Sequence, residues 1–155
     1  MREGRCSRAT DEGEAAMSKE KLEANRELIV NNRFALHNHV VVTDLEDHAA
    51  EGYLDVEDDV TNAYGMVHGG AFYALADVIA GMTARGDGHA WVTQTADLHY
   101  LSTTKEKRIY GKSRVIRRGR ATAIIEAAVT DAAGKELFLA TFTFYCVDGR
   151  VSIRS

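Results

Sequence analysis

The chain has 155 residues, of which 45% are hydrophobic, which is enough for one compact domain with a core. Its formal net charge of −4 argues against a nucleic-acid binder that relies on phosphate contacts. Cys6 and Cys146 form neither a disulfide framework nor a zinc motif. No apolar run approaches membrane-spanning length and no signal-peptide pattern opens the chain, so we expect a cytoplasmic protein.

The first part of the chain divides near Met17. Residues 1–17 are charged, rich in small residues and aperiodic, which is typical of a disordered leader. Either Met17 is the true start or these residues are a real but flexible leader, and a protein that begins at Met17 is expected to be as stable and active as the full chain. Residues 18–36 carry apolar residues at helical spacing and are expected to form an N-terminal helix.

Residues 37–148 are expected to form a single α+β domain, followed by a C-terminal tail over 149–155. One long helix is expected over about 68–85. Stretches with alternating or β-branched apolar residues predict six strands, separated by turn signals. These stretches are 37–45, 49–59, 89–101, 107–118, 121–131 and 136–148. The regular spacing of the last four indicates an antiparallel meander rather than parallel βαβ units.

The expected helix carries one carboxylate among apolar residues. Nearly every residue from Ala71 to Ala84 is small or apolar, but Asp77 lies in the middle. A helix that is apolar on almost every side must be covered on almost every side, and a twisted sheet wrapped around it would cover it. Burying a carboxylate is costly unless it is paired, hydrogen-bonded or protonated. Asp77 is therefore either a satisfied structural carboxylate or a catalytic acid or base.

The helix is preceded by the glycine-rich segment "NAYGMVHGG", residues 62–70. Glycines allow a substrate to approach the backbone closely. Free N–H groups at a helix N-terminus form a site for negative charge, such as a developing oxyanion. A phosphate-binding loop is the competing interpretation, but no Lys-Ser/Thr pair follows the glycines and no parallel strand precedes them.

Together these features resemble the signature of hotdog-fold acyl-CoA thioesterases, in the branch named for the phenylacetate pathway that includes hydroxybenzoyl-CoA thioesterases. The pattern N-x-x-G-x-x-H-G-G followed by L-A-D is carried by Asn62, Gly65, His68, Gly69, Gly70, Leu75, Ala76 and Asp77. The resemblance covers about residues 37–148. It implies an antiparallel sheet wrapped around one long central helix, and homodimers that often pair into homotetramers. It implies no cofactor, because coenzyme A is part of the substrate, no metal, and no nucleic-acid or membrane partner.

The resemblance also implies roles for single residues. Asp77 matches the acidic residue that activates water or attacks the thioester carbonyl directly. Gly69 matches the residue whose N–H binds the carbonyl oxygen, and Asn62 matches the side chain that polarises the thioester or positions water. His68 matches the histidine of the H-G-G turn, which either holds the loop or touches the substrate. Thr93 matches the hydroxyl on the next strand that assists the acid.

Other positions are candidates for contact with the substrate. They are Gly70, Thr95 as a shifted alternative to Thr93, and Arg117, Arg118 and Gly119 in "VIRRGR". The last segment is either a solvated turn or the region that meets the phosphates of coenzyme A. Asp97 would share the face of Thr93 if the strand alternates regularly. The chain departs from the family at "YLSTTKEKRI", where relatives usually carry a proline. The resemblance therefore does not define the structure of this loop or of the substrate-tunnel wall that it forms.

We therefore expect an acyl-CoA thioesterase that hydrolyses an aryl- or medium-chain acyl-CoA to the free acid and CoA. A hotdog enoyl-CoA hydratase is the enzymatic alternative, but such enzymes carry their catalytic Asp and His at a different spacing. The second alternative is a non-catalytic acyl-CoA-binding regulator. It would need a DNA-binding module, and the segment before His37 is too short and too acidic for one.

Overall fold

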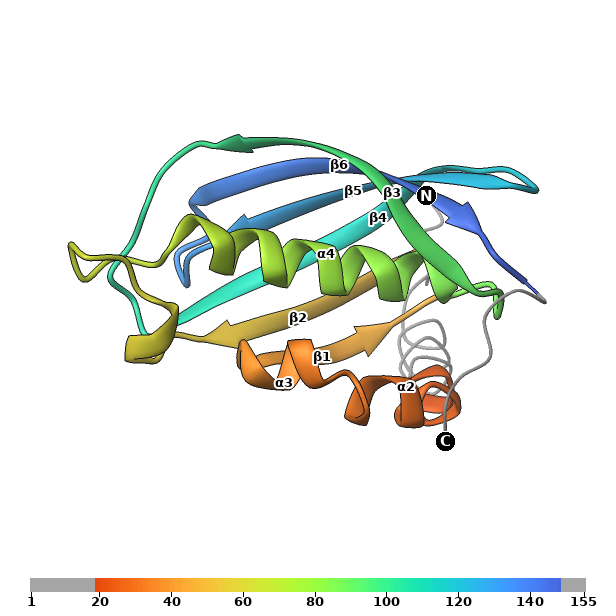
Figure 1. Ribbon diagram of the computed structural model, residues 1–155, viewed down its shortest axis with the longest axis horizontal. Helices are drawn as coiled ribbons and strands as arrows, with labels where there is room; N and C mark the ends of the chain where they lie inside the picture. Colours follow the sequence, from red (N-terminus) through yellow and green to blue (C-terminus); the bar gives the residue numbers. More distant parts are fainter. Residues whose placement is uncertain (1–18, 149–155) are drawn as a thin grey trace, which may run out of the picture.

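A six-stranded antiparallel sheet curves around one central helix, α4 (Gly69–Arg85), in the computed structural model of the protein (Figure 1). The structure describes residues 19–148, so the predicted leader, Met17 and the predicted C-terminal tail lie outside the described residues. The strands are β1 (Val40–Leu45), β2 (Ala49–Asp55), β3 (Trp91–Tyr100), β4 (Arg108–Arg118), β5 (Thr122–Thr130) and β6 (Glu136–Cys146). The predicted α+β class and the predicted sheet wrapped around one helix are confirmed.

The strand order, β1-β2-β4-β5-β6-β3, differs from the meander that the sequence predicted. Of the last four strands, only β4, β5 and β6 follow one another as neighbours. β3 lies at the sheet edge beside β6, and residues 101–107 carry the chain past the N-terminal end of α4 to reach β4 (Figure 1). This loop supports the turn before the helix, because the Val67 N–H donates to the Thr104 carbonyl at 3.1 Å.

Two glycines allow the helix to lie close to the sheet. Gly52 of β2 and Gly111 of β4 face each other in register. A Cβ atom on Gly111 would lie 2.6 Å from Ile79 Cδ1 and 3.0 Å from Leu75 Cγ, both on the inner side of α4. The absence of a side chain at Gly111 therefore sets the distance between helix and sheet.

The sheet covers α4 on every side but one. Ten of its 17 residues are buried, including Leu75, Ala76 and Ile79, which are fully enclosed. All of its half-buried residues except Val78 follow one row at four-residue steps, an i±4 ridge of the helix. This uncovered row consists of Gly69, Tyr73, Asp77, Gly81 and Arg85.

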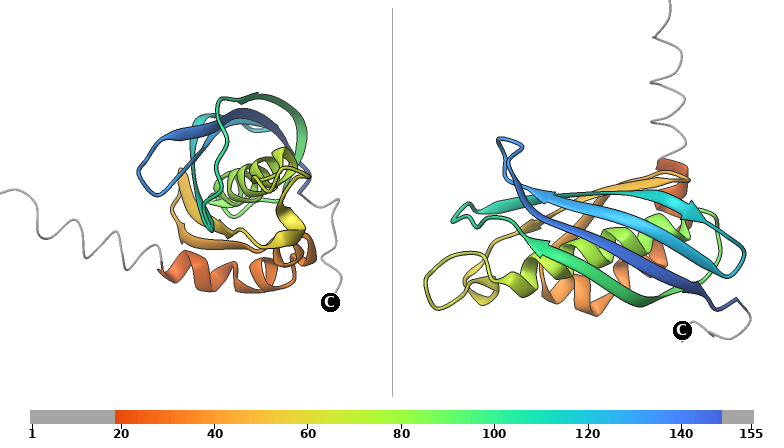
Figure 2. Two further views of the ribbon diagram at one scale, coloured as in Figure 1. Left: turned by 90° about the vertical axis from the view of Figure 1, so that its left-hand side faces the viewer. Right: turned by 90° about the horizontal axis from the view of Figure 1, so that it is seen from above.

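The N-terminal segment is divided into short helices instead of the one helix predicted over 18–36. Residues 19–24 are helical, and α2 (Arg26–Val30) and α3 (Arg33–His37) follow. The Asn32 side chain accepts a hydrogen bond from the Ala35 N–H at 3.0 Å and starts a new helix. These helices lie together along the β1 side of the molecule (Figure 2). Within residues 19–148, no helix has the length and apolar content needed to cross a membrane.

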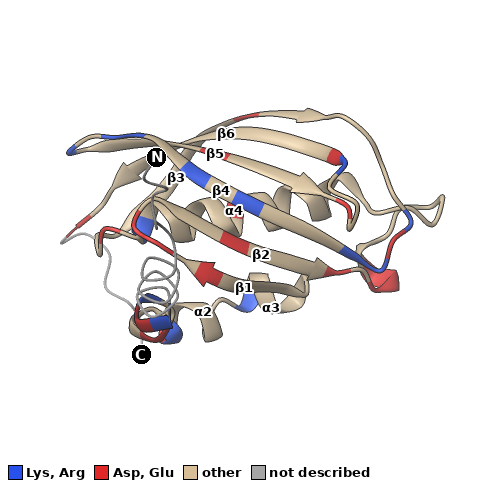
Figure 3. Cartoon of the chain, turned by 180° about the vertical axis from the view of Figure 1, so that it is seen from behind, with Lys and Arg blue, Asp and Glu red and all other residues tan. Residues whose placement is uncertain are grey.

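The outer face of the sheet carries paired charges. Lys112 of β4 pairs with Glu51 of β2 at 3.0 Å, and Arg114 pairs with Glu126 of β5 at 2.8 Å. Both pairs join residues that are opposite one another in register, and blue and red bands mark charged residues on β4 and β2 in Figure 3. This face is therefore solvated.

We expect Gly111→Ala to destabilise the protein by about 1–3 kcal/mol, because the new methyl group overlaps Ile79 and Leu75. Gly81→Ala is the matched control. Its methyl group would meet only Phe144, at 3.8 Å, and alanine is the better helix former by about 1 kcal/mol. Urea unfolding of both variants checks this, and equal stability of the two would contradict the proposed close contact.

Candidate active site

Asp77 occupies the middle of the uncovered row of α4. Its Oδ1 atom accepts a hydrogen bond from the Thr93 hydroxyl of β3 at 2.9 Å. Burial of the carboxyl group raises its pKa above the ordinary value, and the hydrogen bond from Thr93 opposes that rise. Asp77 is thus a half-buried carboxylate with a polar partner and an open side, as a general base requires.

A β-bulge in β3 separates the two threonines that the sequence left as alternatives. Thr93 pairs with Phe144 and Thr95 pairs with Thr143, so that Gln94 is the extra residue. Opposed residues of an antiparallel pair lie on the same face, and Phe144 is buried beneath the sheet. Thr93 therefore faces α4, whereas Thr95 faces outward with Thr143.

The bulge also changes the expectation for Asp97. Because it adds one residue, each position after Gln94 lies on the face opposite to the one that simple alternation predicts. Asp97 pairs with the exposed Thr141 and lies on the outer face. The expectations that Thr95 could replace Thr93 and that Asp97 shares its face are therefore not met.

The first turn of α4 leaves one backbone donor free. His68 is the N-cap, and its Nδ1 atom accepts a hydrogen bond from the Gly70 N–H at 2.8 Å. The Ala71 N–H donates to the His68 carbonyl at 2.9 Å. The Gly69 N–H has no partner among the described residues. It therefore remains available to an oxyanion, while His68 holds the loop and carries its proton on Nε2.

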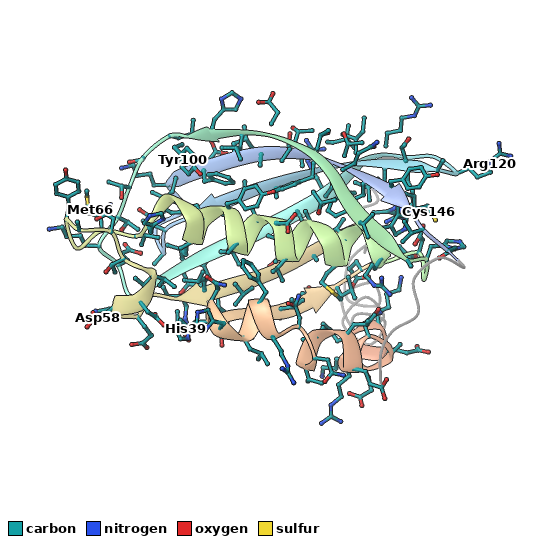
Figure 4. All side chains as sticks on the ribbon, in the orientation of Figure 1. His39, Asp58, Met66, Tyr100, Arg120 and Cys146 are labelled. Carbon is teal, nitrogen blue, oxygen red and sulfur yellow. The ribbon has the colours of Figure 1, made fainter. Side chains whose placement is uncertain are left out.

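Tyr100, at the end of β3, lies against this first turn (Figure 4). A Cβ atom on Gly69 would lie 3.1 Å from the Tyr100 ring, so a side chain at this position would require the ring to shift slightly. The ring also packs on Phe138, with 5.1 Å between the ring centroids. Tyr100 is a neighbour of the predicted oxyanion donor that the sequence did not single out.

Asn62 holds the turn before the helix with one end of its amide. Its Oδ1 atom accepts hydrogen bonds from the N–H groups of Tyr64 at 2.9 Å and Met66 at 3.1 Å. Gly65, at φ +70°, completes the turn. The Asn62 Nδ2 group makes no hydrogen bond to a described residue, so it is free to donate to a ligand.

The two halves of the predicted site do not meet in one chain. Gly69 and Asp77 are eight residues apart on the same helix, which places their Cα atoms about 12 Å apart. An aspartate side chain cannot bridge that distance, although it leans toward the helix N-terminus. Asp77 and Thr93 form one group, and Gly69, Asn62, His68 and Gly70 form another.

The arginines of "VIRRGR" lie in the β4–β5 hairpin, near the C-terminal end of α4 and away from the Gly69 turn (Figure 4). Arg118 donates to the carbonyl oxygens of Thr83 at 2.7 Å and Asp47 at 2.9 Å. It therefore caps the C-terminus of α4, a role that the sequence did not predict because the partners are remote in the chain. Arg117 is exposed, and Gly119 forms the turn through a bond from its N–H to the Thr122 carbonyl at 2.8 Å.

One group of side chains in the described part of the chain could hold a metal ion. His89, Cys146 and Asp148 place one ligand atom each within 4.8 Å of one another. They lie where β3 begins and β6 ends, because Trp91 and Cys146 are paired in register. Another histidine, His39, forms a hydrogen bond with Asp59 at 2.9 Å.

Asp77 and Thr93 line a cavity of about 560 Å³. The cavity lies between the N-terminal helices, α4 and the start of β3. Two polar side chains that the sequence did not assign to the site, Tyr73 and Arg85, share the row of Asp77. Burial and the negative charge of Asp77 raise the pKa of Tyr73. The spacing of Tyr73 and Arg85 from Asp77, which is four and eight residues, is the sequence feature that could have predicted their place on the same row.

Known proteins resemble this chain in sequence and in fold. Residues 64–138, about half of the chain, match the thioesterase superfamily. The Mycobacterium tuberculosis protein Rv1847, whose name assigns it provisionally to the esterases, is 27% identical over 95 residues, which are 57% of this chain and 68% of that protein.

Two solved structures illustrate the similarity in fold. The Streptococcus mutans protein smu.793, solved with acetyl CoA, is 28% identical and has a TM-score of 0.66, over 70% of this chain and 88% of that one. The PaaI protein of the Escherichia coli phenylacetic acid degradation operon is 17% identical and has a TM-score of 0.80, over 88% of this chain and 99% of that one. The hotdog fold that the motif predicted is confirmed, and residues 64–138 of the chain match the thioesterase superfamily.

Proposed function

We propose that the protein is an acyl-CoA thioesterase that hydrolyses an aryl- or medium-chain acyl-CoA in the cytoplasm to the free acid and CoA. The observation that carries the proposal is Asp77, a carboxylate on the one uncovered row of an otherwise buried helix, hydrogen-bonded to Thr93 and open to a cavity. The match to the thioesterase superfamily and the acetyl CoA in the Streptococcus mutans relative support the same class of substrate.

In the proposed reaction, Asp77 takes a proton from a water molecule, which attacks the thioester carbonyl carbon. The carbonyl oxygen becomes negatively charged and receives hydrogen bonds from the Gly69 N–H and the Asn62 Nδ2 group. The tetrahedral intermediate collapses, the carbon–sulfur bond breaks, and the departing thiolate of CoA takes the proton that Asp77 holds. Direct attack by the Asp77 carboxylate, through an anhydride that water then hydrolyses, is the variant with the same residues.

The proposed site combines two protomers. Since Gly69 and Asp77 of one chain lie about 12 Å apart along α4, one carbonyl group cannot contact both. A two-fold dimer would place Gly69 and Asn62 of one protomer next to Asp77 and Thr93 of its partner. We therefore propose a homodimer as the smallest active unit, with a homotetramer formed from two dimers.

An enoyl-CoA hydratase or a non-catalytic acyl-CoA-binding regulator would use the same cavity without releasing a thiol. A thiol-release assay over a panel of CoA esters separates these functions from hydrolysis. Addition of water to an enoyl-CoA without thiol release would support the hydratase, and ester binding without any reaction would support the regulator.

We expect Asp77→Asn to remove nearly all thioester hydrolysis, because an amide cannot accept a proton from water. The fold should persist. A raised carboxyl pKa means that the charged form destabilises the folded state above that pKa, and the neutral amide removes this cost. Thiol release and thermal unfolding at pH 7 check the two statements, and wild-type turnover by the variant would contradict the role of Asp77.

The pH dependence of hydrolysis should report the hydrogen bond between Thr93 and Asp77. Thr93→Val removes a bond that favours the charged carboxylate, so the pKa of Asp77 should rise further. The acidic limb of kcat/KM should then move to higher pH. Thr95→Val, on the outer face, is the matched control and should leave the limb in place. A Thr93→Val limb at the wild-type position would show that Asp77 is not the titrating base.

Subunit mixing tests the two-chain site. Asp77→Ala and Asn62→Ala should each be nearly inactive, since loss of one oxyanion donor costs about 10²–10³-fold. When equal amounts exchange subunits after mild denaturation, about half of the dimers are mixed, and each holds one intact site. Roughly a quarter of wild-type activity should return. No recovery, with exchange confirmed by mass tags, would place Asp77 and Asn62 in the same chain's site.

A further inference from the structure

The cavity beside Asp77 extends along α4 to a second charged residue. Asp77, Gly81 and Arg85 all line it, at four-residue steps on the uncovered row. We propose that Arg85 binds a carboxylate at the far end of the acyl group, so that the preferred substrate is the CoA ester of a dicarboxylic acid. This inference rests on the proposed function and names its substrate class.

The Arg85 guanidinium has no partner in the part of the chain that the structure describes. Its Nε atom is buried without a hydrogen bond, and no ion pair involves it. Two arginines on the sheet are paired, Arg108 with Asp55 at 2.6 Å and Arg114 with Glu126 at 2.8 Å, and Arg118, whose Nε atom is likewise buried without a hydrogen bond, has carbonyl partners for its other nitrogens. A part-buried charge without a partner is costly, and the arginine fork matches a carboxylate with two parallel hydrogen bonds.

The row provides a path of suitable length. Asp77 and Arg85 lie eight residues apart, so their Cα atoms are about 12 Å apart, and the arginine side chain leans back toward Asp77. Gly81 lies between them and has no side chain to block the path. A substrate whose thioester lies at Asp77 therefore extends its acyl chain over Gly81 toward the guanidinium.

The cavity walls fit a methylene chain with one charged end. Most of the remaining lining side chains are apolar, namely Leu28, Phe34, Val78, Met82, Trp91, Val92 and Phe144. Two carboxylates line the same cavity. Asp77 lies at the reacting end, and Glu27 of α2 is exposed to solvent, so that its charge is screened. Arg85 is the only cationic side chain among the described residues that line this cavity.

Adipyl-CoA and hexanoyl-CoA provide a direct test, because their six-carbon acyl groups differ only in a terminal carboxylate or methyl group. We expect the wild-type protein to hydrolyse adipyl-CoA with the higher kcat/KM. Arg85→Met should lower the kcat/KM for adipyl-CoA by at least about tenfold, which is the loss expected for a hydrogen bond to a charged group. The kcat/KM for hexanoyl-CoA should stay within about twofold of the wild-type value. Arg85→Lys should retain part of the preference.

Arg33→Met is the matched control, since it removes an exposed arginine from α3, outside the cavity lining, and should leave the preference unchanged. Equal kcat/KM for the two esters in the wild type, or an equal loss of both in a folded Arg85→Met protein, would overturn the inference.

Calorimetric binding of both esters to the Asp77→Asn protein separates this inference from the proposed function. Tighter binding of adipyl-CoA that Arg85→Met abolishes supports the carboxylate site even if the wild type hydrolyses neither ester. Equal binding of the two esters overturns the carboxylate site even if both are hydrolysed.

Discussion

The site depends on one face of α4 that the sheet leaves open. A helix with ten buried residues and small side chains on most faces would ordinarily be closed on all sides. The sheet ends at β3, however, and the row from Gly69 to Arg85 remains half-buried. A carboxylate on this row keeps contact with solvent and gains a hydrogen bond from Thr93, so its charge is tolerated where burial in the core would neutralise it.

The backbone groups at the two ends of α4 differ in how far other groups of the described chain satisfy them. At the C-terminal end, Arg118 donates to the Thr83 carbonyl and Lys21 donates to the Gly86 carbonyl, so side chains of the same protein satisfy the negative pole. At the N-terminal end, the His68 side chain accepts from the Gly70 N–H, whereas the Gly69 N–H has no partner within residues 19–148. The positive pole is thus the end that remains available to a ligand, which is the arrangement that a developing oxyanion needs.

Most of the fold could be predicted because local sequence patterns determine it. Alternating and β-branched apolar residues predicted the six strands, and the apolar run predicted α4 within one residue of its observed start. The motif likewise predicts Asp77, Gly69 and Asn62 as site residues, and their catalytic roles stay predictions. What could not be predicted depends on contacts that are remote in the chain. The place of β3 beside β6 follows from sheet pairing, and the bulge at Gln94, which separates Thr93 from Thr95, appears only when β3 is aligned with β6. The cap by Arg118 joins residues about 35 positions apart.

Two independent features of the chain support the proposed dimer. The first is the length of α4, which keeps Gly69 and Asp77 apart. The second is β3, an edge strand whose only partner among the described strands is β6 and whose residues from Val92 to Asp97 are all exposed. Exposed edge strands are usually blunted, covered or paired with another chain, and this one carries Thr93 of the proposed site. Pairing of β3 with a second protomer would cover the edge and bring a foreign helix N-terminus to the open row in one step, so the proposed dimer satisfies a structural need and a chemical one with the same contact.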